Sequence, residues 1–558
     1  MIQKTILFLI ILSVAFSCRP KQNVAINTSH EVMQFLDSLS PGRSRGLGLS
    51  ESDMSVESFN RLLEKTQKQL ARLHSFDTAQ LAGDLLIDWK FAESLLAGKE
   101  IDQKAQRWRK DPRVYMAFTG VSAVIESPAS NTRKISQVNK NLILAAEQLA
   151  NGRSQLDTFV PRFQELGLFM AENGRALFEK ELPDFIRNTG DSANVLIEPS
   201  KKAKEELELF IGFLRDELPK KPLGSFVLGA TAYNEMLQRQ FLLGYDADSL
   251  FRFGKAQFEK TLSELEELAK KIDPKKTWQQ LATEIKSEYP NPQKMIEAHQ
   301  EWVDKSREHV LRNNLIPIPW KERVRVVPRV PYLRKTSYYG NFSVAKMKDK
   351  DSIFTSEWNI NPFEDQWDEK RKKEYLVEHD WGVIMVTAPH ETYAGHHIQG
   401  LYQRENPSKL RRENSISIFG EGWGLYNEQL FRETGFYPND KIVLRQLQLR
   451  LWRNARVIYD VGMHTERMTY DEAVKLMTEE VGFLPWAAQL EIDAACASPG
   501  YFIGYFTGMM EILKMREDYK KLKGEKFSLS EFHEQLLRVG SMPIQLMRDG
   551  LWLEENQH

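Results

Sequence analysis

The chain has 558 residues, which is enough for a sizeable core and for two or more domain-sized units. Its 76 basic and 77 acidic side chains give a formal net charge of −1, so nothing indicates a nucleic acid or an anionic surface as a main partner. The only cysteines are Cys18 and Cys496, which excludes a metal site built from cysteine ligands.

The first 17 residues have the features of an export signal. Lys4 precedes an apolar stretch, Ile6–Leu12 and its extension to Phe16, that is too short to span a bilayer. The stretch ends at a serine followed by Cys18, which resembles the bacterial lipoprotein signal, although Phe16 stands where that signal usually has a small residue. We expect an exported protein anchored by lipid on Cys18 in the bacterial cell envelope, on its periplasmic side or at the cell surface. An ordinary signal peptide cut nearby is the alternative.

A tether and a series of helices are expected next. Residues 18–50 are interpreted as a lipidated tether that leads into a first short helix, and residues 51–320 as an N-terminal helical lobe. Apolar residues recur there at spacings of three and four among charged ones, as in an amphipathic helix. The clearest segments are Ser58–Leu73, Ser136–Asn151, Ala203–Leu218 and Leu250–Ile272.

Between Ile316 and Pro362 the pattern changes to that of strands. The expected strands are Val324–Val327, Ser337–Tyr339 and Ser352–Phe354, and prolines at 328 and 331 favour an edge position for the first. An exposed sheet edge could pair with the backbone of an extended peptide, but a purely structural hairpin is the preferred interpretation. Helices are expected again after this small sheet, in a C-terminal catalytic lobe over 321–558.

Eight residues, His390-Glu-Thr-Tyr-Ala-Gly-His-His397, hold three of the eleven histidines. Neutral imidazole is the commonest zinc ligand, and a glutamate beside a metal-bound water, here Glu391, can act as a general base. Two histidines with Glu421 would leave the fourth zinc position open, as a catalytic site requires. The alternative is a helix with incidental histidines.

The spacing of these histidines sets a condition on the backbone. In a straight helix His397 lies on the same face as His390 but about 10.5 Å along the axis, and His396 is closer but rotated off that face. A bulge or break near Ala394-Gly395 would bring one of the two round to His390. Pro389 suits a first helical position, so the helix is expected to begin at the motif.

The helix expected over Lys441–Met468 carries a polar stripe. Its members follow at steps of three, four and four, and they are Arg453, Arg456, Asp460 and His464. The stripe could be a solvated surface, or it could line a cleft in which an arginine holds a substrate carboxylate. Further on, Tyr505 lies in a glycine-flanked segment and could donate its hydroxyl to a developing oxyanion, although such a tyrosine is more often simply packed.

These residues match a family. The runs His390–Gln399, Glu421–Glu428 and Asp460–His464 are similar to the signature of the bacterial domain-of-unknown-function family 885, DUF885. The resemblance is specific from about Val324 onward and extends through Pro499-Gly500, Tyr505 with Gly508, and Phe532-His533. Two departures concern the wall of the cleft: Ala394 replaces the usual proline, and Tyr501-Phe502 replaces the usual Gln-Ala.

That family looks like a distant relative of helical zinc peptidases such as angiotensin-converting enzyme, thimet-type oligopeptidases and Taq-type carboxypeptidases. The likeness implies a mostly α, two-lobed fold with a deep channel. Together with the strands expected above, we expect a small β-sheet beside the active-site helix. Matching the Gly-His of their motif to Gly395-His396 makes His396 the second ligand, across a two-residue insertion, and Glu421 the third.

The sequence therefore predicts an exported zinc metallopeptidase acting on oligopeptides. The expected metal ligands are His390, His396 and Glu421. Among the expected catalytic residues, Glu391 is the general base, and His464 and Tyr505 stabilise the oxyanion. The expected substrate-binding residues are His397, Arg453 and Arg456, and a position behind the metal ligands is the alternative for His397. One alternative is a hydrolase of another amide or ester at the same site. The other is a helical surface lipoprotein that binds a partner and has a structural metal site.

Overall fold

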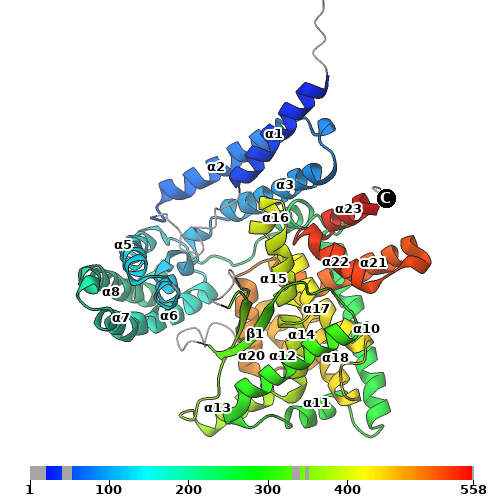
Figure 1. The fold of residues 1–558 in the computed structure, drawn as a ribbon. Coiled ribbons are helices and arrows are strands. Elements are labelled where there is room, and N and C mark those ends of the chain that lie inside the picture. Colours follow the sequence, from blue (N-terminus) through cyan, green and yellow to red (C-terminus); the bar gives the residue numbers. More distant parts are fainter. Residues whose placement is uncertain (1–20, 40–52, 128, 330–339, 346–350, 556–558) are drawn as a thin grey trace, which may run out of the picture.

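The computed structural model describes residues 21–39, 53–127, 129–329, 340–345 and 351–555, and these are mostly helical (Figure 1). The expected helices are confirmed. They lie within α2 (Val56–His74), α5 (Asn131–Gln155), α8 (Ile197–Gly212) with the helical turns after it, and α10 (Ala247–Ile272). Among the described residues, every helix is too short or too polar to cross a membrane.

The segment expected to be a tether is helical in part. Lys21–Leu39 forms α1, in which Val32 and Leu36, one turn apart, are buried. The helix packs against α3 (Gly83–Lys104) and α16 (Lys409–Glu413). Cys18 lies outside the described residues.

The buried apolar residues form two main clusters. The smaller draws on residues between 115 and 218, from α4 (Val121–Glu126), α5, α6 (Pro161–Ala176), α7 (Leu182–Thr189) and α8, which gather at one side of the molecule in Figure 1. The larger joins earlier helices to the C-terminal half of the chain. It includes α3, α10 and α12 (Met295–Arg312), so helices before residue 320 belong to both clusters. The division expected at residue 320 stays a prediction.

The sheet has three strands in the order β1-β3-β2. β1 (Glu322–Pro328) runs parallel to β3 (Phe354–Ile360), and β2 (Asn341–Ser343) is antiparallel to β3. The sequence correctly predicted β1 at an edge, but the strand expected at Ser352–Phe354 begins at Phe354 and is longer. The segment 337–339 lies outside the described residues.

The outer edge of β1 is occupied. The side-chain amide of Gln300, from α12, donates to the carbonyl of Val324 at 3.2 Å and accepts from the N–H of Val326 at 2.9 Å. These backbone groups are the ones that a peptide strand would use, so peptide pairing at this part of the edge is not supported.

The helices that carry the site lie in the larger cluster. They are α14 (Trp381–Glu391), α15 (His396–Glu405), α17 (Ser417–Glu433), α18 (Asp440–His464) and α21 (Ile503–Lys523). Other α-helices of the C-terminal half of the chain are α13 (Glu369–Glu378), α19 (Tyr470–Lys475), α20 (Pro485–Cys496), α22 (Leu529–Val539) and α23 (Ile544–Glu555). Two shorter helices, α9 (Ala230–Glu235) and α11 (Trp278–Lys286), come earlier in the chain. At Gly422 and Gly508, α17 and α21 meet backbone to backbone, because a Cβ on Gly422 would lie 2.6 Å from the Cα of Gly508.

Candidate metal centre

Helix α14 delivers the first histidine of the motif. The side chain of Asp380 caps the start of the helix by accepting from the N–H of Val383, and the helix runs from Trp381 to Glu391. Pro389 therefore lies inside the helix and not at its first position, contrary to expectation. Because a proline removes one helical hydrogen bond, its place near the end is consistent with termination two residues later.

The backbone break expected near Ala394-Gly395 is confirmed. α14 stops at Glu391, and α15 begins at His396. The chain turns so tightly that a Cβ on Gly395 would overlap the carbonyl oxygen of His390, so only glycine fits there. This turn brings His396, and not His397, back to His390.

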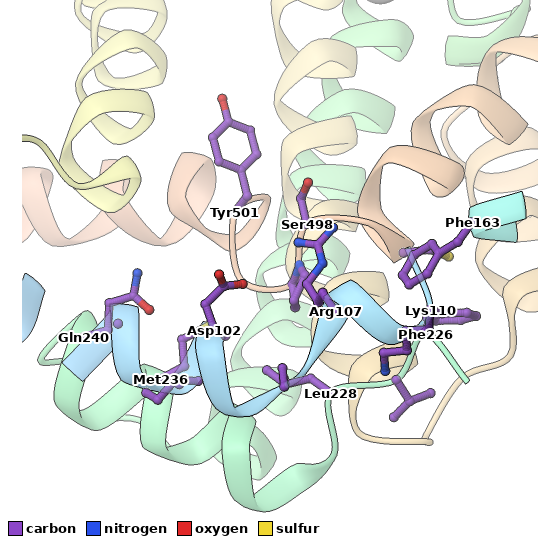
Figure 2. A pocket seen from close by; sticks show the side chains of 16 residues that line it. Asp102, Arg107, Lys110, Phe163, Phe226, Leu228, Met236, Gln240, Ser498 and Tyr501 are labelled. Carbon is purple, nitrogen blue, oxygen red and sulfur yellow. The ribbon is translucent and has the colours of Figure 1, made fainter. Parts of the chain in front are cut away.

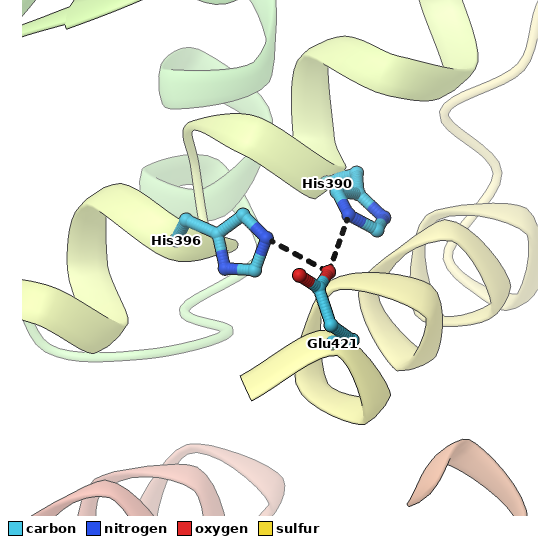
Figure 3. Close-up of side chains that lie close together, drawn as sticks. All are labelled: His390, His396 and Glu421. Carbon is cyan, nitrogen blue, oxygen red and sulfur yellow. Dashed lines mark ion pairs between the residues drawn. The ribbon is translucent and has the colours of Figure 1, made fainter. Parts of the chain in front are cut away.

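His390, His396 and Glu421 come together (Figure 3). Each offers one ligand atom, and the three atoms lie within 4.8 Å of one another. Oε2 of Glu421 is 3.7 Å from Nε2 of His390 and 3.5 Å from Nε2 of His396. Two ligands of one zinc ion, each about 2.0–2.1 Å from it, can be no more than about 4.2 Å apart. Both distances to Glu421 are within this limit, so the two nitrogens and the carboxylate oxygen could hold a metal ion.

A second glutamate of α17 orients His390. Oε1 of Glu428 is 2.9 Å from Nδ1 of His390 and 3.2 Å from a terminal nitrogen of Arg453. A carboxylate can only accept, so Nδ1 carries a proton, and Nε2 is the nitrogen that the neutral ring would offer to a metal ion beside Glu421. Gly424 leaves room for the ring, because a Cβ there would lie 2.6 Å from it. Sequence reasoning assigned Glu428 no role, although it follows Glu421 by two turns of one helix.

Tyr501 holds the other carboxylate oxygen. Its hydroxyl donates to Oε1 of Glu421 at 2.6 Å and lies 3.4 Å from the hydroxyl of Tyr505. Nδ1 of His396, the other ring nitrogen of that ligand, lies 3.1 Å from the side-chain oxygen of Gln399. Sequence reasoning noted Tyr501 only as a departure from the family, so its contact with a predicted ligand is a finding of the structure.

The charges of the group are strongly coupled. Burial works against the charged form of His390, but hydrogen bonds with Glu421 and Glu428 outweigh it and raise the pKa of His390 to about 9. Burial likewise opposes the charged form of Glu421, and the two histidines outweigh it and hold the pKa of Glu421 well below its usual range. Since a metal ion requires neutral imidazole, protons compete with a metal for this site.

A cavity of about 410 Å³ opens beside the group. It is lined by His390 and by four other residues with predicted roles, namely Glu391, Arg453, Arg456 and Tyr505. The arginines are buried, so the polar stripe of α18 does not form a solvated surface. The ring of Tyr505 is stacked on that of His390, with the centroids 6.3 Å apart.

His464 lies away from this cavity, contrary to the predicted oxyanion role. It is fully buried at the end of α18, with Nε2 3.0 Å from the carbonyl oxygen of Ala495 and its ring between Phe226 and Tyr233. Four residues earlier, Asp460 accepts from the backbone N–H groups of Gly500 and Phe502. The residues of α18 after Arg456 no longer line the cavity. Asp460 instead holds the loop that carries Tyr501 through these two hydrogen bonds.

His397 also faces away from the cavity. It is fully buried, with Nδ1 2.8 Å from the hydroxyl of Ser356 and Nε2 2.9 Å from Oε2 of Glu322. Glu322 further accepts from the Tyr393 hydroxyl and, at 2.9 Å, from Arg307. This network ties the motif to the sheet, and it leaves His397 no surface for the substrate contact that the sequence predicted.

A second cavity, of about 350 Å³, lies on the other side of Tyr501. Figure 2 shows its polar lining, with Asp102 and Arg107 near the end of α3 and Ser498 and Tyr501 on the segment that follows α20. Tyr501 lines both cavities, so the two spaces meet at a residue that also contacts a candidate metal ligand.

Known proteins with the same fold exist. The family model described as a bacterial protein of unknown function, DUF885, matches residues 46–551. A protein of Shewanella oneidensis, described as a lipoprotein of unknown function, has 21% sequence identity and a TM-score of 0.76 over 95% of this chain and 98% of its own. A protein of Colwellia psychrerythraea, also described as a lipoprotein, has 16% identity and a TM-score of 0.76 over 95% and 99%. No curated protein matches the chain. At these identities the two structures establish the fold alone.

Proposed function

Since the chain belongs to the DUF885 family, whose function is unknown, we propose from the site itself that the protein is a zinc-dependent peptidase. The observation that carries this proposal is the group of His390, His396 and Glu421 beside a cavity that His390 and Glu391 line. A purely structural metal site needs no additional carboxylate facing an open space, whereas hydrolysis needs a base there.

The ligand set favours zinc. Imidazole nitrogen and carboxylate oxygen are common zinc ligands, and three protein ligands leave a position for water or substrate. When bound, zinc lowers the pKa of a coordinated water and polarises the carbonyl of the substrate. Glu428 supports this assignment, because an imidazole that binds a metal through one nitrogen usually donates the other N–H to a carboxylate.

The side chains around the cavity divide the remaining tasks. Glu391 removes the proton of the attacking water and passes it to the leaving amine. The hydroxyl of Tyr505, 3.4 Å from that of Tyr501, donates to the oxyanion that forms on the substrate carbonyl. We propose that the protein has the two-lobed helical architecture of these peptidases, with the site in a deep channel.

We place the enzyme outside the cytoplasm, held to a membrane by lipid on Cys18. The apolar stretch before that cysteine supports export, and both structural relatives are described as lipoproteins.

Metal analysis combined with a peptide-library digestion tests the function. We expect about one zinc per chain, cleavage products visible by mass spectrometry, and loss of cleavage after chelation with recovery on adding zinc. Hydrolysis of ester or non-peptide amide substrates alone would point to another zinc hydrolase. Zinc-loaded protein without any hydrolysis would contradict catalysis and favour a binding protein.

A further inference from the structure

Arg456 occupies an unusual position at the metal cavity. Its side chain is 7% exposed, lines the cavity, and lies against the rings of Trp452, Phe502 and Tyr505. Its Nε donates to Oε1 of Glu491 at 2.7 Å. The guanidinium group is therefore fixed in orientation by packing and by one charge-assisted hydrogen bond.

The two terminal nitrogens of Arg456 have no hydrogen-bond partner in the described part of the chain. A guanidinium has five N–H donors, and the terminal nitrogens of Arg456 are not fully buried, so they can pair with a group that enters the cavity. Arg453 differs, because its terminal nitrogens donate to the Leu449 carbonyl and to Glu428. Of the two arginines at the cavity, Arg456 is the one that can bind an added carboxylate in the two-pronged manner.

The distance from Arg456 to the metal group is bounded by Tyr505. The guanidinium carbon is 4.1 Å from the centre of the Tyr505 ring, and that centre is 6.3 Å from the centre of the His390 ring. The guanidinium carbon of Arg456 is therefore no farther from the centre of the His390 ring than the sum of these two distances. An extended peptide covers about 3.3–3.6 Å per residue, so at most about three residues fit between them.

We propose that Arg456 binds the C-terminal carboxylate of the peptide, so that the enzyme removes one to three residues from the carboxyl end of its substrates. In this hydrolysis water adds to the carbonyl carbon and the C–N bond breaks. The short product keeps the original carboxylate and gains an amino group. This inference rests on the proposed peptidase function and specifies its substrate class.

The first test uses the zinc-loaded, unmodified enzyme and an N-acetylated octapeptide library made in two forms, with a free C-terminal carboxylate and with a C-terminal amide. We expect the free acids to be cleaved roughly ten- to hundredfold faster, the loss expected for a charge-assisted bidentate contact. Mass spectrometry should find C-terminal fragments of one to three residues. Equal rates for both forms, or mainly longer fragments, would overturn this inference alone. Cleavage of neither form would contradict the peptidase function itself.

A variant pair assigns the effect to the residue. Arg456→Lys keeps the charge but loses the planar fork, so the ratio of free-acid to amide rates should fall at least several-fold. Arg450→Lys is the matched control, because Arg450 is a buried arginine of the same helix, 2.6 Å from Glu264, and does not line the metal cavity. Its ratio should equal that of the unmodified enzyme. An unchanged ratio in folded, zinc-loaded Arg456→Lys would exclude Arg456 as the carboxylate site.

Discussion

His390 lies between two glutamates of α17, with Nε2 3.7 Å from Oε2 of Glu421 and Nδ1 2.9 Å from Oε1 of Glu428. The glutamates are seven residues apart, so both point from the same face of the helix. One therefore completes the candidate metal group while the other fixes which ring nitrogen is free to join it. Arg453, 3.2 Å from Glu428, offsets the buried negative charge.

Replacing Glu428 by glutamine should weaken metal binding without removing it. The amide oxygen can still accept from Nδ1 of His390, but the charge that makes the imidazole a better ligand is lost. We expect a 10- to 100-fold higher dissociation constant for zinc, since changes of this kind usually have that effect. Competition with a chelating dye measures it.

Glu433→Gln provides the control for that change. Glu433 is on the same helix and pairs with Arg516 at 2.9 Å, away from the metal group. Its zinc affinity should match that of the unmodified protein. An unchanged affinity in Glu428→Gln would mean that this contact only supports packing.

The candidate metal group could be predicted because most of its residues are close together in the sequence. The His-Glu pair, the nearby second histidine and the glycine before it are all read directly from His390 to His396. Even the backbone break followed from helix geometry, because a straight helix cannot bring these histidines together.

The outcome for His397 and His464 depended on contacts that the sequence does not display. Glu322, the partner of His397, is 75 residues earlier in the chain, and the carbonyl group that meets His464 belongs to Ala495. Helical phase places a side chain on one face, but whether that face meets a cavity or a buried network depends on the packing of distant elements. For the same reason, the contact of Tyr501 with Glu421 could not be predicted from the sequence.

Lipid attachment gives a prediction about location. Cys18→Ser removes the only sulfur at the end of the apolar N-terminal stretch. The variant should no longer incorporate labelled palmitate and should leave the membrane fraction. Continued membrane association without labelling would instead indicate an uncleaved N-terminal anchor.

The two adjacent histidines should respond differently to alanine. His396→Ala removes a candidate metal ligand, so zinc should be lost while the free energy of unfolding changes little. His397→Ala leaves the buried Glu322 without one partner and should cost about 2–4 kcal/mol of stability. Its folded fraction should still bind zinc.

Metal analysis and denaturant titration of both variants separate the two roles. If His397→Ala loses the metal with unchanged stability, while His396→Ala keeps it, the assignment of ligands is reversed.

A buried histidine predicts how stability depends on pH. His533 is fully buried, with Nδ1 2.7 Å from the carbonyl oxygen of Leu315 and Nε2 2.7 Å from the hydroxyl of Tyr426. Burial lowers the pKa of His533 from its ordinary value of 6.5 to about 4. Between these values the unfolded chain binds the proton and the folded protein does not, so stability falls as the pH falls. The contribution approaches about 3 kcal/mol at pH 4.

His533→Gln should flatten this dependence, because glutamine does not titrate. Urea unfolding is measured at pH 7.5 and pH 5, with a metal chelator present so that metal binding does not contribute. The loss of stability between the two pH values should be smaller for the variant than for the unmodified protein. A parallel loss in both would mean that His533 is not the group responsible.

The decisive test of catalysis is Glu391→Gln. Glu391 lines the cavity beside His390 but is not one of the three residues whose ligand atoms come together. The amide has nearly the same size and cannot take a proton from water. Zinc content and stability should therefore stay near those of the unmodified protein, while hydrolysis falls by at least about 10²–10⁴-fold. Loss of zinc would make Glu391 a ligand, and retention of most of the activity would exclude it as the base. Either result separates the role of Glu391 from that of Glu421, because replacing Glu421 should remove the metal and the activity together.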